Sequence, residues 1–182
     1  MDRQVHRIDE SRKNDFYKVH CAMNNAAWCF CVAWWVPTWD NFSQRQAMQN
    51  YQLRDRLFKR GEYDGYLLYV DGRPVGWSQV GPRDRLEKLT REYELAADPH
   101  TWAITCFLIT PSYRRMGLAE FMLKEIVADL KTRGAGRVEA FPRRGETLGE
   151  CDMWTGPEAV FRRAGFCTVK DDPERPILAL DL

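Results

Sequence analysis

The run from Trp102 to Thr110 is the feature of this sequence that most constrains its fold. It contains apolar, β-branched, aromatic and small residues and no charge, which predicts a buried β-strand. Pro111 ends the run, a turn with two arginines follows, and a helical pattern starts at about Gly117. The first N–H groups of a helix lack intrahelical partners and carry the positive end of the helix dipole. This order of elements therefore predicts a phosphate site.

The turn between the predicted strand and helix has the residue types that an anion site requires. Gly117 has no Cβ at the point where an anion must approach closely, and Arg114 and Arg115 add positive charge. A nucleoside triphosphatase loop is excluded, because the chain has no Gly-x-x-x-x-Gly-Lys-Ser/Thr motif. The alternative is an ordinary basic turn of an α/β domain.

The remaining segments supply further strands and helices by their residue patterns. Asp71-Gly72 between two apolar runs predicts a hairpin, in which Gly76 indicates a bulge or a close backbone approach. His20 lies on the apolar stripe of the first helix, which favours a packed core histidine over a catalytic one. Strands are predicted at 4–8, 26–36, 65–70, 75–80, 102–110, 137–141, 167–170 and 177–182. Helices are predicted after residue 11 and at about 40–60, 82–96, 118–133 and 156–163.

The sequence Arg114-Arg115-Met116-Gly117-Leu118-Ala119 resembles the acyl-CoA-binding loop of the GCN5-related N-acetyltransferase (GNAT) superfamily, which reads Arg/Gln-x-x-Gly-x-Gly/Ala. The buried strand before it, the long amphipathic helix after it, and the later strand and short helix agree with that family. The resemblance implies one domain over residues 1–182 with an α/β (α+β) fold. Its sheet is expected to be mixed and mostly antiparallel, with six to seven strands and helices on both faces.

The resemblance also implies acetyl-CoA as the cosubstrate and indicates which residues hold it. In the family, strands equivalent to 75–80 and 102–110 splay apart, and main-chain groups in the gap pair with the pantetheine arm and the thioester. Carried over by position, the cofactor-binding residues are Phe107, Leu108, Ile109, Arg114, Arg115, Met116, Gly117, Leu118, Ala119 and Phe161. No metal is expected, because the six cysteines and three histidines show no ligand spacing.

The implied reaction is the transfer of an acetyl group to a primary amine by direct attack in a ternary complex. Glu139 is the candidate base, because it lies on the strand next to the site. The alternative is that the alternation of side chains along the strand turns Glu139 outward or into an ion pair. Ser78 and Gln79 are alternatives that would hold a water. Many family members have a tyrosine where this chain has Phe161, which cannot protonate the departing thiolate and would only pack against the pantetheine or acyl end. Tyr113 is expected to be structural.

Trp28, Trp34, Trp35 and Trp39 lie close together in the sequence and either fill a core or line an acceptor pocket. The second interpretation favours a flat, apolar or cationic small-molecule amine, with Asp40 nearby, over a protein acceptor. Two other functions stay open. One is a catalytically weak acyl-CoA-binding or regulatory module, and the other is a structural domain with an incidental basic loop.

The overall composition narrows the classes of partner. A net charge of +1 is too balanced for a general nucleic-acid binder. The longest uncharged apolar run, residues 26–36, is shorter than the roughly 20 residues that cross a bilayer, so no membrane partner is expected. No secretory or transit segment is apparent, which predicts a cytoplasmic protein. Dimers are frequent in the family, and the expectation of a homodimer rests on that resemblance alone.

Overall fold

The computed structural model describes residues 1–23, 27–146, 148–149, 152 and 154–182. Its seven-stranded sheet has the order β1-β2-β3-β4-β5-β7-β6. Strands β4 and β5 run parallel, and the other neighbouring pairs are antiparallel. The strands are β1 (Arg3–Arg7), β2 (Tyr66–Val70), β3 (Arg73–Pro82), β4 (Thr101–Ile109), β5 (Arg137–Ala140), β6 (Cys167–Lys170) and β7 (Ile177–Asp181). The mixed, mostly antiparallel sheet implied by the resemblance is confirmed.

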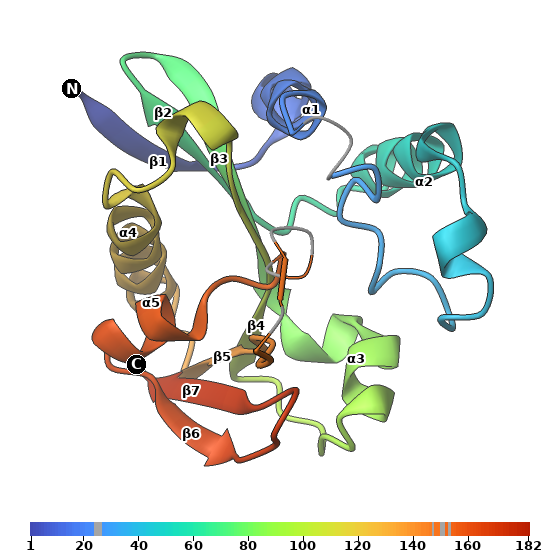
Figure 1. Ribbon diagram of the computed structural model, residues 1–182, viewed down its shortest axis with the longest axis vertical. Coiled ribbons are helices and arrows are strands. Elements are labelled where there is room, and N and C mark those ends of the chain that lie inside the picture. The colour runs from blue at the N-terminus through green and yellow to red at the C-terminus, as the bar shows by residue number, and fades with distance from the viewer. Residues whose placement is uncertain (24–26, 147, 150–151, 153) are drawn as a thin grey trace.

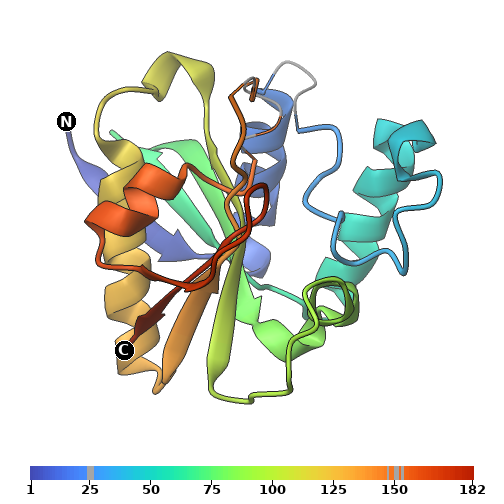
Figure 2. The same cartoon turned by 60° about the horizontal axis from the view of Figure 1, so that its bottom comes forward.

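Helices cover both faces of this sheet (Figure 1). One face carries α1 (Lys13–Cys21), α2 (Ala47–Lys59) and α3 (Glu87–Glu92), and the other carries α4 (Leu118–Thr132) and α5 (Glu158–Arg163). Figure 2 shows the same layers, with α2 standing farthest from the sheet. Short 3₁₀ turns lie at Glu10–Arg12, Phe42–Gln44, Arg83–Arg85 and Pro111–Tyr113. No helix in the described part of the chain is long and apolar enough to cross a bilayer.

The two faces have separate apolar cores. The inner stripe of α4 includes Met122 and Ile126, which are fully buried together with Val138 of β5 and Leu178 of β7. On the other face, the ring of Phe16 from α1 lies 4.7 Å from that of Trp77 on β3. Because alternate residues of a strand point to opposite faces, each central strand contributes to both cores.

The hairpin of β2 and β3 forms as its turn sequence predicts, and Gly76 lies at a close backbone approach. A Cβ at Gly76 would come within 2.8 Å of Ile109 Cδ1 on β4 and 3.2 Å of Leu68 Cβ on β2. The partner strand shifts register between Leu68 and Tyr69 at this point. The glycine thus lets three strands pack closely beside the end of β4.

The prediction of a strand at 26–36 is wrong. Residues 27–35 form successive turns, and Phe30 and Cys31 have positive φ values of 43° and 51°. The carbonyl groups of both residues accept hydrogen bonds from the buried guanidinium of Arg54 on α2 instead of from a neighbouring strand. The apolar composition correctly indicated burial, but a short apolar run does not distinguish a strand from a buried coil.

Two helices are shorter than their patterns predict. The helix expected from residue 40 begins at Ala47, because Asn41 adopts a left-handed conformation and a 3₁₀ turn intervenes. Its N-terminus is capped where Gln46 N donates to Gln49 Oε1 at 2.8 Å. The helix expected over 82–96 is a 3₁₀ turn followed by α3 alone. By contrast, α4 matches the predicted 118–133 within one residue.

The splayed strands are β4 and β5, not the pair that the resemblance implied. Strand β3 stays paired with β4 from Gly76 opposite Ile109 to Pro82 opposite Trp102. Strand β4 pairs with β5 only as far as Ile104, opposite Ala140. Beyond Ile104, the second half of β4 therefore has an edge that no strand within the described residues covers. The expectation that β3 and β4 separate is corrected.

Candidate active site

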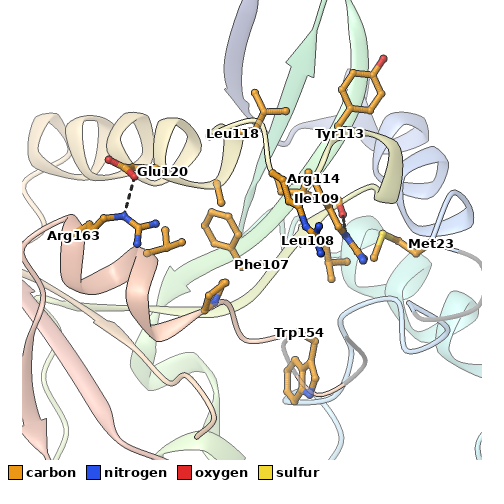
Figure 3. A pocket seen from close by; sticks show the side chains of 15 residues that line it. Met23, Phe107, Leu108, Ile109, Tyr113, Arg114, Leu118, Glu120, Trp154 and Arg163 are labelled. Carbon is orange, nitrogen blue, oxygen red and sulfur yellow. Dashed lines mark hydrogen bonds and ion pairs between the residues drawn. The ribbon is translucent and has the colours of Figure 1, made fainter. Parts of the chain in front are cut away.

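A cavity of about 390 Å³ lies between the uncovered half of β4, the start of α4 and α5; we call it the β4–α4 cavity (Figure 3). It is lined by Met23, Phe107, Leu108, Ile109, Tyr113, Arg114, Arg115, Gly117, Leu118, Ala119, Glu120, Trp154, Pro157, Val160 and Arg163. Eight of the residues proposed from the resemblance are in this set, whereas Met116 and Phe161 are not. The β4–α4 connection thus brings the proposed cofactor residues to one concave surface.

The turn before α4 has the geometry of an anion site. Arg115 and Gly117 have positive φ values of 61° and 72°, so the backbone reverses twice before the helix begins. No described side chain caps the N-terminus of α4, and a Cβ at Gly117 would meet nothing within 4 Å. The amide groups of the first turn therefore face open space at the positive end of the helix dipole.

The arginines of this turn differ in their surroundings. Arg114 is partly buried, and its Nε donates to the Ile109 carbonyl at 3.0 Å, which holds the turn against the end of β4. Arg115 is exposed on the cavity rim. Arg163 of α5 pairs with Glu120 of α4 at 3.1 Å across the cavity (Figure 3). Met116 is 45% exposed and does not contribute to the lining.

The uncovered edge of β4 is partly occupied by the chain itself. Phe107 N donates to the Trp154 carbonyl at 2.8 Å, and Thr110 N, three residues on, donates to the Val75 carbonyl of β3. Because successive residues turn their main-chain groups to opposite edges, Phe107 and Ile109 face the gap and Leu108 faces β3. The proposed main-chain contact at Leu108 is therefore corrected, because that residue pairs with Trp77.

Phe161 supports the cavity from behind without lining it. It is fully buried, with its ring 6.3 Å from that of Phe107 and 5.4 Å from that of Phe166. A Cβ at Gly156 would come within 2.9 Å of the Phe161 ring. Phe161 thus sets the position of Phe107, while Pro157 and Val160 supply the α5 side of the lining.

The structure places Glu139 in a buried ion pair. Its two carboxylate oxygens accept from Arg83 Nη1 at 3.0 Å and from Arg137 Nε at 3.3 Å. It lines neither the β4–α4 cavity nor the aromatic cavity described below. Ser78 Oγ donates to the Cys106 carbonyl, and Gln79 Oε1 accepts from Arg54. Glu139 thus has the ion pair that was the alternative to its role as a base, and Ser78 and Gln79, proposed to hold a water, each use one side-chain atom in a contact within the protein.

A second cavity, of about 630 Å³, adjoins the first at Trp154, which lines both. We call it the aromatic cavity; its lining comes from the coil before α2, from α3 and from the segments after β5. The lining residues are Trp28, Cys29, Ala33, Trp34, Trp39, Phe42, Glu92, Tyr93, Phe141, Arg143, Trp154, Thr155 and Arg175. Trp34 and Trp39 thus line a pocket as one interpretation predicted, whereas Trp35 lies on a smaller cavity and Asp40 on neither.

The sequence analysis missed the contribution of the 154–157 segment. The sequence shows no periodicity here, so the prediction assigned residues 154–155 to no element and residues 156–157 to the start of a short helix. The signal available was local: Trp154 is a large aromatic residue shortly before Gly156, whose φ is 93°.

Among the described residues, no group of three or more histidine, cysteine or acidic side chains has the arrangement of a metal site.

Comparisons with solved structures give the same fold at low sequence identity. The PaiA N-acetyltransferase from Thermoplasma acidophilum, solved in complex with coenzyme A, aligns over 100% of both chains with a TM-score of 0.61 and 11% identity. The ribosomal-protein-S18-alanine N-acetyltransferase from Escherichia coli covers 99% of this chain and 94% of its own, with a TM-score of 0.57 and 13% identity. An acetyltransferase from Thermus thermophilus covers 100% and 98%, with a TM-score of 0.59 and 16% identity.

No curated protein sequence matches the chain significantly. The family model described as acetyltransferase (GNAT) family matches residues 28–155, which include β4, the basic turn and α4. This match covers more than half of the chain and contains the turn from which the resemblance was drawn. The chain therefore belongs to the acetyltransferase (GNAT) family.

Proposed function

We propose that this protein transfers an acetyl group from acetyl-CoA to the primary amine of a small molecule. The observation that carries the proposal is the position of the uncovered edge of β4 beside the uncapped N-terminus of α4. An extended amide-containing arm can pair with such an edge, and a pyrophosphate suits the adjacent helix start. Binding of coenzyme A by the similar protein from Thermoplasma acidophilum supports the same assignment.

The residues that line the β4–α4 cavity suit the two ends of acetyl-CoA. The first amides of α4, with Arg115 and Gly117, would hold the pyrophosphate. The main-chain groups of Phe107 and the amide of Ile109 face the gap and would pair with the pantetheine and thioester end, whereas the Ile109 carbonyl already accepts from Arg114. For the latter contact, Phe107 N must exchange the Trp154 carbonyl for a ligand oxygen. A strand N–H placed there would stabilise charge that develops on the thioester oxygen.

The proposed reaction is balanced without any further reactant. The neutral amine nitrogen forms a bond to the acetyl carbon, the carbon–sulfur bond breaks, and one proton leaves the nitrogen while one reaches the sulfur. The aromatic cavity would hold the acceptor next to the thioester, because the two cavities meet at Trp154. A small molecule suits this concave, aromatic lining better than a protein tail does.

A second candidate function is an acyl-CoA-binding module with weak or absent turnover. It is favoured by Glu139 being held in an ion pair and by a phenylalanine at position 161. The two functions differ in one observable, because only the enzyme releases free thiol in the presence of an amine.

Thermal unfolding with excess acetyl-CoA, CoA or ATP tests the cofactor assignment. A ligand at about 100 times its Kd adds about 2.7 kcal/mol to the free energy of unfolding, which corresponds to a shift of about 5 °C or more at this chain length. A shift with acetyl-CoA and CoA but not ATP is expected, followed by thiol release with a panel of amines. No shift with any of the three would overturn both candidate functions, and binding without thiol release would favour the module.

A further inference from the structure

The aromatic cavity has polar groups in its wall that the protein leaves without hydrogen bonds. Trp34 Nε1, Thr155 Oγ1 and Arg143 Nε are buried atoms that have no partner among the described residues. Trp34 and Thr155 are only 5% and 3% exposed. A buried donor without an acceptor is costly, and native proteins rarely retain one without a reason. Each of these atoms has less than 1 Å² of accessible surface, so a ligand that supplies acceptor atoms would reach them with a small shift of the side chains that carry them.

The charges around this cavity are mainly positive. Arg143 and Arg175 lie in its wall, and Glu92 is the acidic residue among the lining. Arg143 Nη1 pairs with Asp152 at 2.8 Å, and this ion pair leaves Arg143 Nε without an acceptor. A carboxylate matches such a wall, because charged acceptors form the strongest hydrogen bonds to guanidinium and indole donors.

The cation-binding face of the tryptophans is already used by the protein. The ammonium group of Lys88 lies 3.4 Å from the centre of the Trp39 ring and 5.6 Å from that of Trp34. Lys88 reaches this position from α3 and is 2% exposed. A second cation bound beside these rings would be repelled by Lys88. The aromatic lining is therefore suited to a neutral flat ring and not to a cationic one.

We propose that the acceptor is a flat aromatic amine that carries a carboxylate, bound in the aromatic cavity. Its ring would pack among Trp34, Trp39 and Phe42, and its carboxylate would lie at Arg175 and draw the unpartnered donors of the wall toward it. The amine would point past Trp154 toward the β4–α4 cavity. A volume of about 630 Å³ is ample for a molecule of the size of an aromatic amino acid. This inference rests on the proposed acetyltransferase function and specifies its substrate class.

The test compares amines that differ only in the carboxylate. L-tryptophan is compared with tryptamine, and L-phenylalanine with phenethylamine, by thiol release at saturating acetyl-CoA. The expected result is a kcat/KM at least about tenfold higher for the carboxylated member of each pair. Equal or better use of the decarboxylated amines would overturn the inference. Acetyl-CoA binding is measured separately by thermal shift, so a failure of the cofactor assignment is distinguished from the wrong acceptor class.

A binding measurement keeps the proposal testable if none of these amines reacts. Indole-3-acetate has the ring and the carboxylate without the amine, and calorimetry measures its binding to the full chain with and without CoA. Saturable binding is expected that 3-methylindole, which lacks the carboxylate, does not reproduce. Absence of binding, or equal binding of 3-methylindole, contradicts the proposal.

Two variants with matched controls locate the ligand. Trp34→Phe keeps an aromatic ring but removes the indole N–H, and Arg175→Gln removes a charge from the exposed rim. Each should weaken indole-3-acetate binding at least about fivefold. Trp35→Phe removes an equally unpartnered indole N–H that lies on the smaller cavity, and Arg60→Gln removes an exposed arginine elsewhere. The controls should bind as the wild type does; equal effects in all four variants would overturn the assignment.

Discussion

The amide of Phe107 donates to the carbonyl of Trp154 at 2.8 Å, across the gap that β4 and β5 leave open. Phe107 thus lies at the centre of the proposed cofactor site, and Trp154 lies between that site and the aromatic cavity. The segment at Trp154 occupies the edge that a pantetheine arm would use. If acetyl-CoA takes this edge as proposed, its binding would displace Trp154 and so change the wall of the aromatic cavity.

We expect acetyl-CoA to replace the Trp154 carbonyl as the partner of Phe107 N. Samples labelled with ¹⁵N at the nine phenylalanines give a small set of amide resonances, in which Phe107→Leu identifies that of Phe107. Saturating acetyl-CoA should shift the Phe107 resonance. Phe16, on the opposite face of the sheet, serves as the control and should not move. An unchanged Phe107 resonance at saturation would show that the segment stays in place.

Gly117→Ala should weaken CoA binding at least about tenfold while costing only about 1 kcal/mol of stability. The cost arises because Gly117 has a φ of 72°, and the loss of binding because a Cβ would enter the space in front of the α4 amides. Gly134→Ala is a matched control at the other end of α4, with a φ of 73° and equally open surroundings. The Tm of both variants should fall by similar amounts. Calorimetry should show a lower affinity for CoA in Gly117→Ala alone. Equal affinities would contradict the phosphate site.

The elements that position the proposed cofactor site could be predicted because local sequence determines them. The buried run of β4, the proline after it and the amphipathic period of α4 each identify one element. The hairpin turn at Asp71-Gly72 likewise fixes β2 against β3. Each of these signals extends over a few residues, so it can be recognised in the sequence without knowledge of the tertiary contacts.

The aromatic cavity could not be predicted, because its wall depends on long-range contacts. The coil at 27–35 is held by Arg54, which lies on a helix whose polar residues suggest a solvated face. Arg54 is fully buried in the structure, and nothing in its own neighbourhood of the sequence indicates that. The ion pair of Glu139 could not be predicted for a similar reason, since its partner Arg83 lies 56 residues away.

Glu139→Gln should lower stability and leave turnover nearly intact. The change leaves the buried guanidinium of Arg83 without its strong counter-charge, and breaking a buried ion pair costs about 3–5 kcal/mol. Tm should fall by roughly 6 °C or more. The double variant Arg83→Met/Glu139→Met removes both charges and should recover part of this loss. A catalytic base would behave differently, because its removal lowers kcat about 10²–10⁴-fold.

Acid should destabilise the protein through His20 between about pH 6.5 and 5. Burial lowers the pKa of His20 from 6.5 to about 3, because the imidazolium would lose its hydration. Its Nδ1 lies 2.9 Å from the Phe16 carbonyl and its Nε2 lies 3.4 Å from Cys31 Sγ, so the neutral ring is already accommodated. The unfolded chain binds a proton below about pH 6.5 and the folded chain does not, so the free energy of unfolding decreases as pH falls.

The slope expected from this difference is about 1.4 kcal/mol per pH unit, or about 2 kcal/mol between pH 6.5 and 5. Glu158, whose pKa is lowered from 4.5 to about 2 mainly by its hydrogen bond with Arg144, adds acid sensitivity only below about pH 4.5. Urea unfolding at several pH values measures the slope in the wild type, in His20→Gln and in His100→Gln, which changes an exposed histidine. His20→Gln is expected to be less stable throughout but nearly independent of pH in this window, whereas His100→Gln should keep the wild-type slope. If His20→Gln retained that slope, the acid sensitivity would have to come from another group.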